Sequence, residues 1–170
     1  MSVTKRLIEQ PAVVAVGANL GDRQGTLLAA VRELAQSDGV EVTAISPVIE
    51  TLALKTEGID PDAPRYLNAV VLLRTTLTPD ALLDTLHRIE QQHGRVRAER
   101  WGDRTLDLDI VDFAGLTRSD ERLTLPHPRA FERDFVLKPW LEVDPDAVLP
   151  GHGSVAALVA GLDAAGGVAS

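Results

Sequence analysis

The chain has 170 residues, of which 45% are hydrophobic, and a formal net charge of −8. This length and composition fit one compact soluble domain, and the acidic balance argues against a general nucleic-acid binder, which needs clustered Lys and Arg. The chain contains no cysteine, which excludes disulfides and thiolate metal sites. Its apolar runs fall short of the roughly 20 residues that cross a bilayer, and its N-terminus lacks a signal-peptide profile, so we expect a cytoplasmic protein.

We expect a single domain over residues 1–170, with its core in residues 12–149 after a polar lead-in at residues 1–10. The end of the chain, GLDAAGGVAS at residues 161–170, is rich in Gly and Ala and lacks side chains that would anchor it. We therefore predict that these last ten residues are loose.

The first half of the chain predicts a strand, a helix and a second strand. PAVVAVG at residues 11–17 is a Val-rich run that ends in glycine, which is typical of a buried strand. Apolar residues recur at helical spacing in residues 25–39. Residues 40–51 are rich in β-branched residues but contain Pro47, which predicts an irregular or edge strand. The long loop that follows, residues 52–65, is of a kind that is usually functional or disordered.

The second half predicts the same order of strand, helix and strand. YLNAVVLLRTT at residues 66–76 predicts a strand, and residues 78–94 predict a helix with Thr78 as N-cap and Pro79 at the first helical position. After a basic loop at residues 95–104 comes the strand TLDLDIVDF, and residues 123–143 should add a short strand and short helices. The order β-α-β-β-α-β predicts an α+β, ferredoxin-like split β-α-β sandwich, with an antiparallel sheet and helices packed on one face.

Two carboxylates stand out in the strand at residues 105–113. Because side chains alternate across a strand, Leu106, Leu108 and Ile110 should face the core while Asp107 and Asp109 face away from it, about 6.5 Å apart. Taken alone, such a pair is more often a solvated strand face than a site. It is also spaced to hold two divalent ions about 4 Å apart.

The loop before this strand favours the second interpretation. Four arginines fall within ten residues of an otherwise acidic chain: Arg95, Arg97, Arg100 and Arg104. Guanidinium groups bind phosphate oxygens bidentately, and carboxylates hold metals, so the combination is typical of a site for a metal–polyphosphate complex. Trp101 in the same loop either covers a flat group or anchors the loop. His127, between two prolines, is either structural or a donor to phosphate.

Four segments resemble, in order, the signature segments of the 6-hydroxymethyl-7,8-dihydropterin pyrophosphokinases of folate biosynthesis. They are GANLGDR, YLNAVV, RIEQQHGRVRAERWGDRTLDLDI and LTLPHPRAFERDFVLKPW. The resemblance implies a ferredoxin-like fold and a reaction that moves the β,γ-diphosphate of ATP to the pterin hydroxymethyl group and releases AMP. It also implies two Mg ions, ATP and the pterin as small-molecule partners, with neither nucleic acid nor membrane, and we expect a monomer.

The resemblance also assigns residues. It implies that Asp107 and Asp109 bind the metals, and that the catalytic groups are Arg95, Arg104 and Asp109. The residues that it places against ATP are Arg95, Arg97, Arg100, Trp101, Arg104, Ile110, Arg122, Thr124, His127 and Arg133. Those that it places against the pterin are Thr51, Leu54, Tyr66, Asn68, Asp107 and Phe135. Glu90 on the second helix is expected to orient an arginine of the basic loop.

Two rival functions remain open at this point. One is a different D-x-D transferase, such as an enzyme that uses nucleotide sugars, although that class ordinarily needs a larger two-part fold. The other is a ferredoxin-like sensing module in which Asp107 and Asp109 are only a solvated strand face. The second rival predicts that nucleotide binding does not depend on metal.

Overall fold

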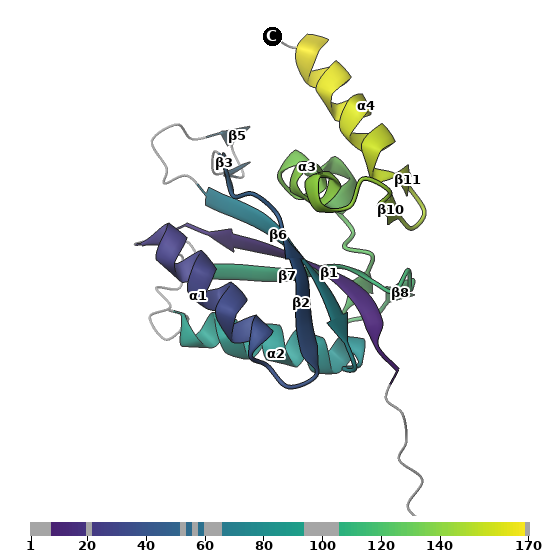
Figure 1. The fold of residues 1–170 in the computed structure, drawn as a ribbon. Coiled ribbons are helices and arrows are strands. Elements are labelled where there is room, and N and C mark those ends of the chain that lie inside the picture. The colour runs from purple at the N-terminus through teal and green to yellow at the C-terminus, as the bar shows by residue number, and fades with distance from the viewer. Residues whose placement is uncertain are drawn as a thin grey trace, which may run out of the picture.

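The computed structural model describes residues 8–19, 22–51, 54–55, 58–59, 66–93 and 106–168. An antiparallel sheet forms its centre (Figure 1). The strands of this sheet are β1 (Gln10–Ala18), β2 (Val40–Ile45), β3 (Ile49–Thr51), β6 (Tyr66–Thr75) and β7 (Leu106–Phe113). The order across the sheet is β2-β6-β1-β7, with β3 also paired to β6. Together with helices α1 (Arg23–Ala35) and α2 (Pro79–Gln92), this arrangement confirms the predicted α+β fold.

Local signals in the sequence fix the starts of both helices. The Thr78 side chain accepts a hydrogen bond from the backbone N–H of Ala81 (3.1 Å), and Pro79 opens α2 as predicted. The Asp22 side chain does the same for Gly25 at the start of α1 (3.0 Å). Each contact satisfies a backbone donor that has no partner inside the helix.

The irregularity predicted at Pro47 separates β2 from β3. The backbone N–H of Ser46 donates to the carbonyl of Val70 (2.9 Å), and the Ser46 hydroxyl accepts from the N–H of Val70 (2.8 Å). The side chain of Ser46 therefore bridges the break, and both short strands stay paired with β6.

Helices cover both faces of the sheet, not one as predicted. Helices α1 and α2 pack on the face that carries Val14, Val16, Leu106 and Leu108. Helix α3 (Asp134–Val143) packs on the opposite face, where Trp140 contacts a second apolar cluster. The members of this second cluster that come from the sheet are Val13, Val70 and Val111. The sheet has apolar side chains on both faces and therefore needs a covering layer on each.

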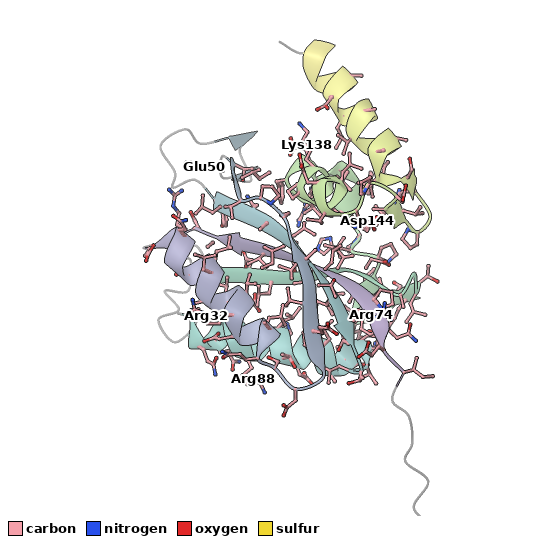
Figure 2. All side chains as sticks on the ribbon, viewed as in Figure 1. Arg32, Glu50, Arg74, Arg88, Lys138 and Asp144 are labelled. Atoms are coloured by element: carbon pink, nitrogen blue, oxygen red, sulfur yellow. The ribbon has the colours of Figure 1, made fainter. Side chains whose placement is uncertain are left out.

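Helix α4 (Val155–Val168) corrects the prediction of a loose end for residues 161–168. Val155 and Val159 are buried in the second cluster, and Lys138 of α3 forms an ion pair with Asp163 of α4 (2.9 Å), so the helix is anchored to α3 (Figures 1 and 2). Alanine is the best helix former, and it offsets the low propensity of the glycines here. Composition alone did not reveal these anchors.

The remaining elements are short. They are β4 (Leu54–Lys55) paired with β5 (Gly58–Ile59), β8 (Arg118–Ser119) paired with β9 (Thr124–Leu125), the 3-10 helix η2 (Ala130–Glu132), and β10 (Val148–Leu149) paired with β11 (Gly153–Ser154). The short strand and the helices expected in residues 123–143 are thus present. Within the described part of the chain, no helix is both long enough and apolar enough to span a bilayer.

Candidate active site

Asp107 and Asp109 lie on the face of β7 that does not pack against α1 and α2. In the strand register Asp107 pairs with Gly17 and Asp109 with Ala15, so both carboxylates stand beside small residues of β1. The opposite face of β7 packs into the first core, the apolar cluster between the sheet and helices α1 and α2, through Leu106, Leu108 and Ile110. The alternation predicted from the sequence is therefore present, and the two carboxylates share one face.

Residues expected to meet the pterin surround Gly17. Asn68 pairs with Gly17 across β6 and β1, and its Nδ2 donates to the hydroxyl of Thr51 (2.6 Å). A methyl group added at Gly17 would lie 3.2 Å from Asn68 Oδ1 and 3.8 Å from a ring carbon of Tyr66. The missing side chain at Gly17, on the strand that pairs with Asp107 on its other side, therefore leaves this space to Asn68 and Tyr66. This role of Gly17 was not predicted from the sequence, although glycine at the end of a buried strand can mark a close approach.

A break in the pairing of β7 brings His127 to the sheet. Val14 pairs with Ile110 while Val13 pairs with Asp112, so Val111 is the extra residue of a β-bulge. The carbonyl of Val111 accepts a hydrogen bond from the backbone N–H of His127 (2.9 Å). The segment after β9 is thereby held against the strand that carries the carboxylates.

The side chain of His127 lies near charged groups of both signs, Asp109 of β7 and the arginines Arg129 and Arg133. Burial lowers the pKa of His127, the Asp109 carboxylate opposes this change, and Arg133 and Arg129 reinforce it. The Nδ1 atom of His127 accepts from the backbone N–H of Arg129 (3.2 Å), which requires that this nitrogen carry no proton. The guanidinium of Arg133 lies 5.6 Å from the centre of the Phe135 ring. Asp109, His127, Arg133 and Phe135 thus form one neighbourhood.

Glu90 makes a backbone contact that the sequence did not predict. Its side chain is 7% exposed, and Oε2 accepts from the backbone N–H of Leu108 (3.1 Å). Because β7 is the outer strand of the sheet, N–H groups on its open side need partners from elsewhere. Glu90 therefore fixes the strand between the two aspartates. Its predicted arginine partners lie outside the described residues.

Arg122 lies against α2. Its Nε contacts Asp80 Oδ1 (2.8 Å) and its Nη2 contacts Asp84 Oδ1 (2.5 Å). Asp80 also pairs with Arg118 of β8, so the β8–β9 hairpin is held to the first two turns of α2. Nothing in the spacing of the sequence shows that residues 80 and 122 meet, so the contacts of these aspartates could not be predicted from it.

The other predicted residues fall into four cases. Thr124 lies in β9, two residues from Arg122. The side chain of Ile110 is 3% exposed and sits in the first core, so contact with a nucleotide would have to use its backbone. Leu54 is placed only as part of β4. The predicted residues of the basic loop lie outside the described residues: Arg95, Arg97, Arg100, Trp101 and Arg104.

The two carboxylates fit hard divalent ions. Mg²⁺ prefers oxygen ligands and is typically bound by one or two carboxylates together with water and substrate phosphates. Among the described residues, no three His, Asp or Glu side chains converge as a ready-made metal cage. Asp107 and Asp109 are of the chemical type that binds Mg²⁺ together with the phosphates of a substrate.

Comparisons of the sequence with known proteins all match one family. The model of the 7,8-dihydro-6-hydroxymethylpterin-pyrophosphokinase (HPPK) family matches residues 13–145. The chain is 43% identical over 142 residues to a 2-amino-4-hydroxy-6-hydroxymethyldihydropteridine pyrophosphokinase of Synechocystis sp., covering 84% of this chain and 70% of the relative. A relative of the same name from Methylorubrum extorquens is 41% identical over 155 residues, covering 91% of this chain and 95% of the relative.

Solved structures agree on the fold. A Plasmodium falciparum HPPK-DHPS crystal structure superposes with a TM-score of 0.71 over 93% of this chain, at 13% identity. The chain spans 46% of the length of that protein. This likeness concerns the fold alone, whereas the family match and the curated relatives concern the reaction. On that evidence, the chain belongs to the HPPK family, which transfers a pyrophosphoryl group from ATP to hydroxymethyldihydropterin in folate synthesis.

Proposed function

We propose that the chain carries out the reaction of its family on the face of β7 that presents Asp107 and Asp109. The observation that carries this proposal is the register of β1, β6 and β7, which puts Asp107 beside Gly17 and Gly17 beside Asn68. Residues assigned to the metals and to the pterin thus fall on one continuous patch, although they come from distant parts of the sequence. A solvated strand face would not need this convergence.

The pterin binds next to Asp107, between Tyr66 and Phe135. Asn68 is buried and already bonded to Thr51, so its amide is held in one orientation before the substrate arrives. An oriented amide can recognise the donor and acceptor pattern of a flat heterocycle. Leu54 belongs to the same proposed set.

Asp107 and Asp109 hold two Mg ions together with the phosphates of ATP. Metal ions at this position neutralise charge on the phosphates and align the transferred group. The protein's own contribution is to keep both carboxylates on one face at fixed spacing, with Glu90 holding the backbone of Leu108 between them. Asp109 also accepts a hydrogen bond from the pterin hydroxyl and helps to take up its proton.

The nucleotide lies along the edge of the sheet, from the β8–β9 hairpin to the start of α3. Arg122, Thr124, His127 and Arg133 lie in this order in the sequence, and the backbone of His127 is tied to β7. The arginines of the basic loop complete the set: Arg95, Arg97, Arg100 and Arg104, with Trp101 in the same loop. Arg95 and Arg104 stabilise the charge that develops on the phosphates during transfer. Catalysis then depends mainly on position and electrostatics.

The other parts of this proposal concern the protein as a whole. It acts as a monomer on small-molecule substrates, without nucleic acid or a membrane. Its use of ATP fits the cytoplasmic location expected from the sequence.

An assay of product identity tests this proposal. The purified chain is mixed with ATP, Mg²⁺ and 6-hydroxymethyl-7,8-dihydropterin, and AMP and ADP are separated and quantified for the parent and for Asp109→Ala. We expect AMP and pterin diphosphate in equal amounts from the parent and a large loss in the variant. Formation of ADP in place of AMP, or an unchanged rate in the variant, would contradict the proposed site.

A further inference from the structure

We infer that Asp84 sets the affinity of the chain for nucleotide by competing with the nucleotide phosphates for Arg122. This inference rests on the proposed role of Arg122 in ATP binding. It concerns an acidic residue that neither the resemblance nor the family reaction assigns. The basis is a difference between two neighbouring arginines, Arg118 and Arg122, that share a carboxylate on α2.

Arg118 makes structural contacts through all three of its guanidinium nitrogens. Nη1 and Nη2 form a bidentate pair with Asp80 (2.9 and 3.0 Å), and Nε donates to Asp120 (2.6 Å). Asp120 in turn accepts from the backbone N–H groups of Arg122 and Leu123 (2.9 Å each), which shapes the turn of the hairpin. Arg118 therefore fastens the hairpin to α2.

Arg122 is held less completely. Its side chain is 47% exposed, and the side chain of its partner Asp84 is 68% exposed. The contacts to Asp80 and Asp84 use Nε and Nη2. A phosphate that binds this edge of the guanidinium bidentately must displace these carboxylate oxygens, because Nε already donates to Asp80 and Nη2 already donates to Asp84. Exposed ion pairs are weak enough for such an exchange.

The net charge of the side chains around Arg118 and Arg122 also supports competition between Asp84 and phosphate. Three carboxylates, Asp80, Asp84 and Asp120, surround two guanidinium groups. The cluster therefore carries a net negative charge where a polyphosphate is proposed to approach. The hydrogen bond and charge of Asp84 are the main causes that raise the pKa of Arg122, which is consistent with a close pair. Asp84 is the acid that does not also hold Arg118.

Removing the charge of Asp84 should therefore strengthen nucleotide binding. In Asp84→Asn, Arg122 keeps its contact with Asp80, and the cluster becomes neutral. We expect the Kd for a non-hydrolysable, methylene-bridged ATP analogue with Mg²⁺ to fall about fivefold, the size of one exposed ion pair. The KM for ATP should fall with it, while kcat stays the same or decreases if product release limits turnover.

Three further variants make the test specific. Asp84→Glu keeps the charge and should bind nucleotide as the parent does. Asp163→Asn removes a comparably exposed carboxylate, paired with Lys138 far from the hairpin, and should leave the Kd unchanged. In an Arg122→Gln background, Asp84→Asn should gain little, because the group for which Asp84 competes is gone.

The sign of the change decides the question. A weaker or unchanged Kd in Asp84→Asn, with thermal stability like that of the parent, would overturn the inference and make Asp84 a structural partner of Arg122. A gain of equal size in Asp163→Asn would overturn it too, since net charge alone would then explain the effect. Failure of the parent to form AMP would count against the proposed function, and the binding comparison would still decide the role of Asp84.

Discussion

The two faces of β7 carry different residues because they have different covers. Leu106, Leu108 and Ile110 lie against α1 and α2, and all three are buried. On the opposite face Val111 packs under α3, whereas Asp107 and Asp109 are only partly buried beside Gly17 and Ala15. The difference teaches that an edge strand of the sheet can hold two carboxylates when the covering layer reaches only part of one face.

The largest expected effect is a loss of activity after a substitution on the face of β7 that carries the two carboxylates. Asp109→Asn keeps the shape of the side chain but removes its charge. We expect the rate of AMP formation to fall about 10²- to 10³-fold, as when one group that stabilises transition-state charge is lost. Steady-state kinetics with thermal unfolding of the same sample check this prediction. A rate within twofold of the parent would contradict it.

The matched change on the other face should affect stability instead. Leu108 is 3% exposed, so Leu108→Ala leaves a cavity between the sheet and its helices. We expect the free energy of unfolding to fall by about 2–5 kcal/mol, as measured by denaturant titration. At a temperature where the variant is folded, its kcat should stay close to that of the parent. A variant as stable as the parent would show that this face is not the core.

A smaller effect is expected where the sheet approaches the pterin. Gly17→Ala puts a methyl group 3.2 Å from Asn68 Oδ1, so the amide must move by a few tenths of an ångström. We expect the KM for the pterin to rise about tenfold, equivalent to about 1.4 kcal/mol, with little change in the KM for ATP. Equal changes in both KM values would argue against a contact specific to the pterin.

The smallest expected effect concerns pH. The pKa of His127 is lowered in the folded chain, chiefly by burial, so the unfolded chain binds a proton more readily. The free energy of unfolding should therefore be highest above pH 6.5 and decrease as the pH falls through the window just below that value. His127→Gln should lose this part of the decrease. An identical pH profile for the variant, measured by denaturant titration without Mg²⁺, would contradict the assignment.

Patterns within single elements could be predicted from the sequence. The order of strands and helices, the cap at Thr78 and the shared face of Asp107 and Asp109 follow from local periodicity and turn chemistry. Contacts between distant elements could not. The pairs Glu90 with Leu108 and Arg122 with Asp84 join residues 18 and 38 positions apart, and no spacing rule specifies them.

The same limit explains the corrections in the fold. Helix α3 covers the second face because Val13, Val70 and Val111 are apolar there, and these residues come from three strands. Helix α4 extends to Val168, and its first turns are anchored where Val155 and Val159 lie in the same apolar cluster as residues of α3. Both outcomes depend on tertiary packing, which in α4 overrides the weak signal of a Gly/Ala-rich composition.

The most direct test of the central claim measures how Mg²⁺ changes nucleotide binding. Calorimetric titration of a methylene-bridged ATP analogue, with and without Mg²⁺, is compared between the parent and Asp109→Asn. If Asp107 and Asp109 hold metals with the phosphates, Mg²⁺ should tighten binding strongly in the parent and much less in the variant. Equal tightening in both proteins would contradict the claim and leave the two aspartates as a solvated face of β7.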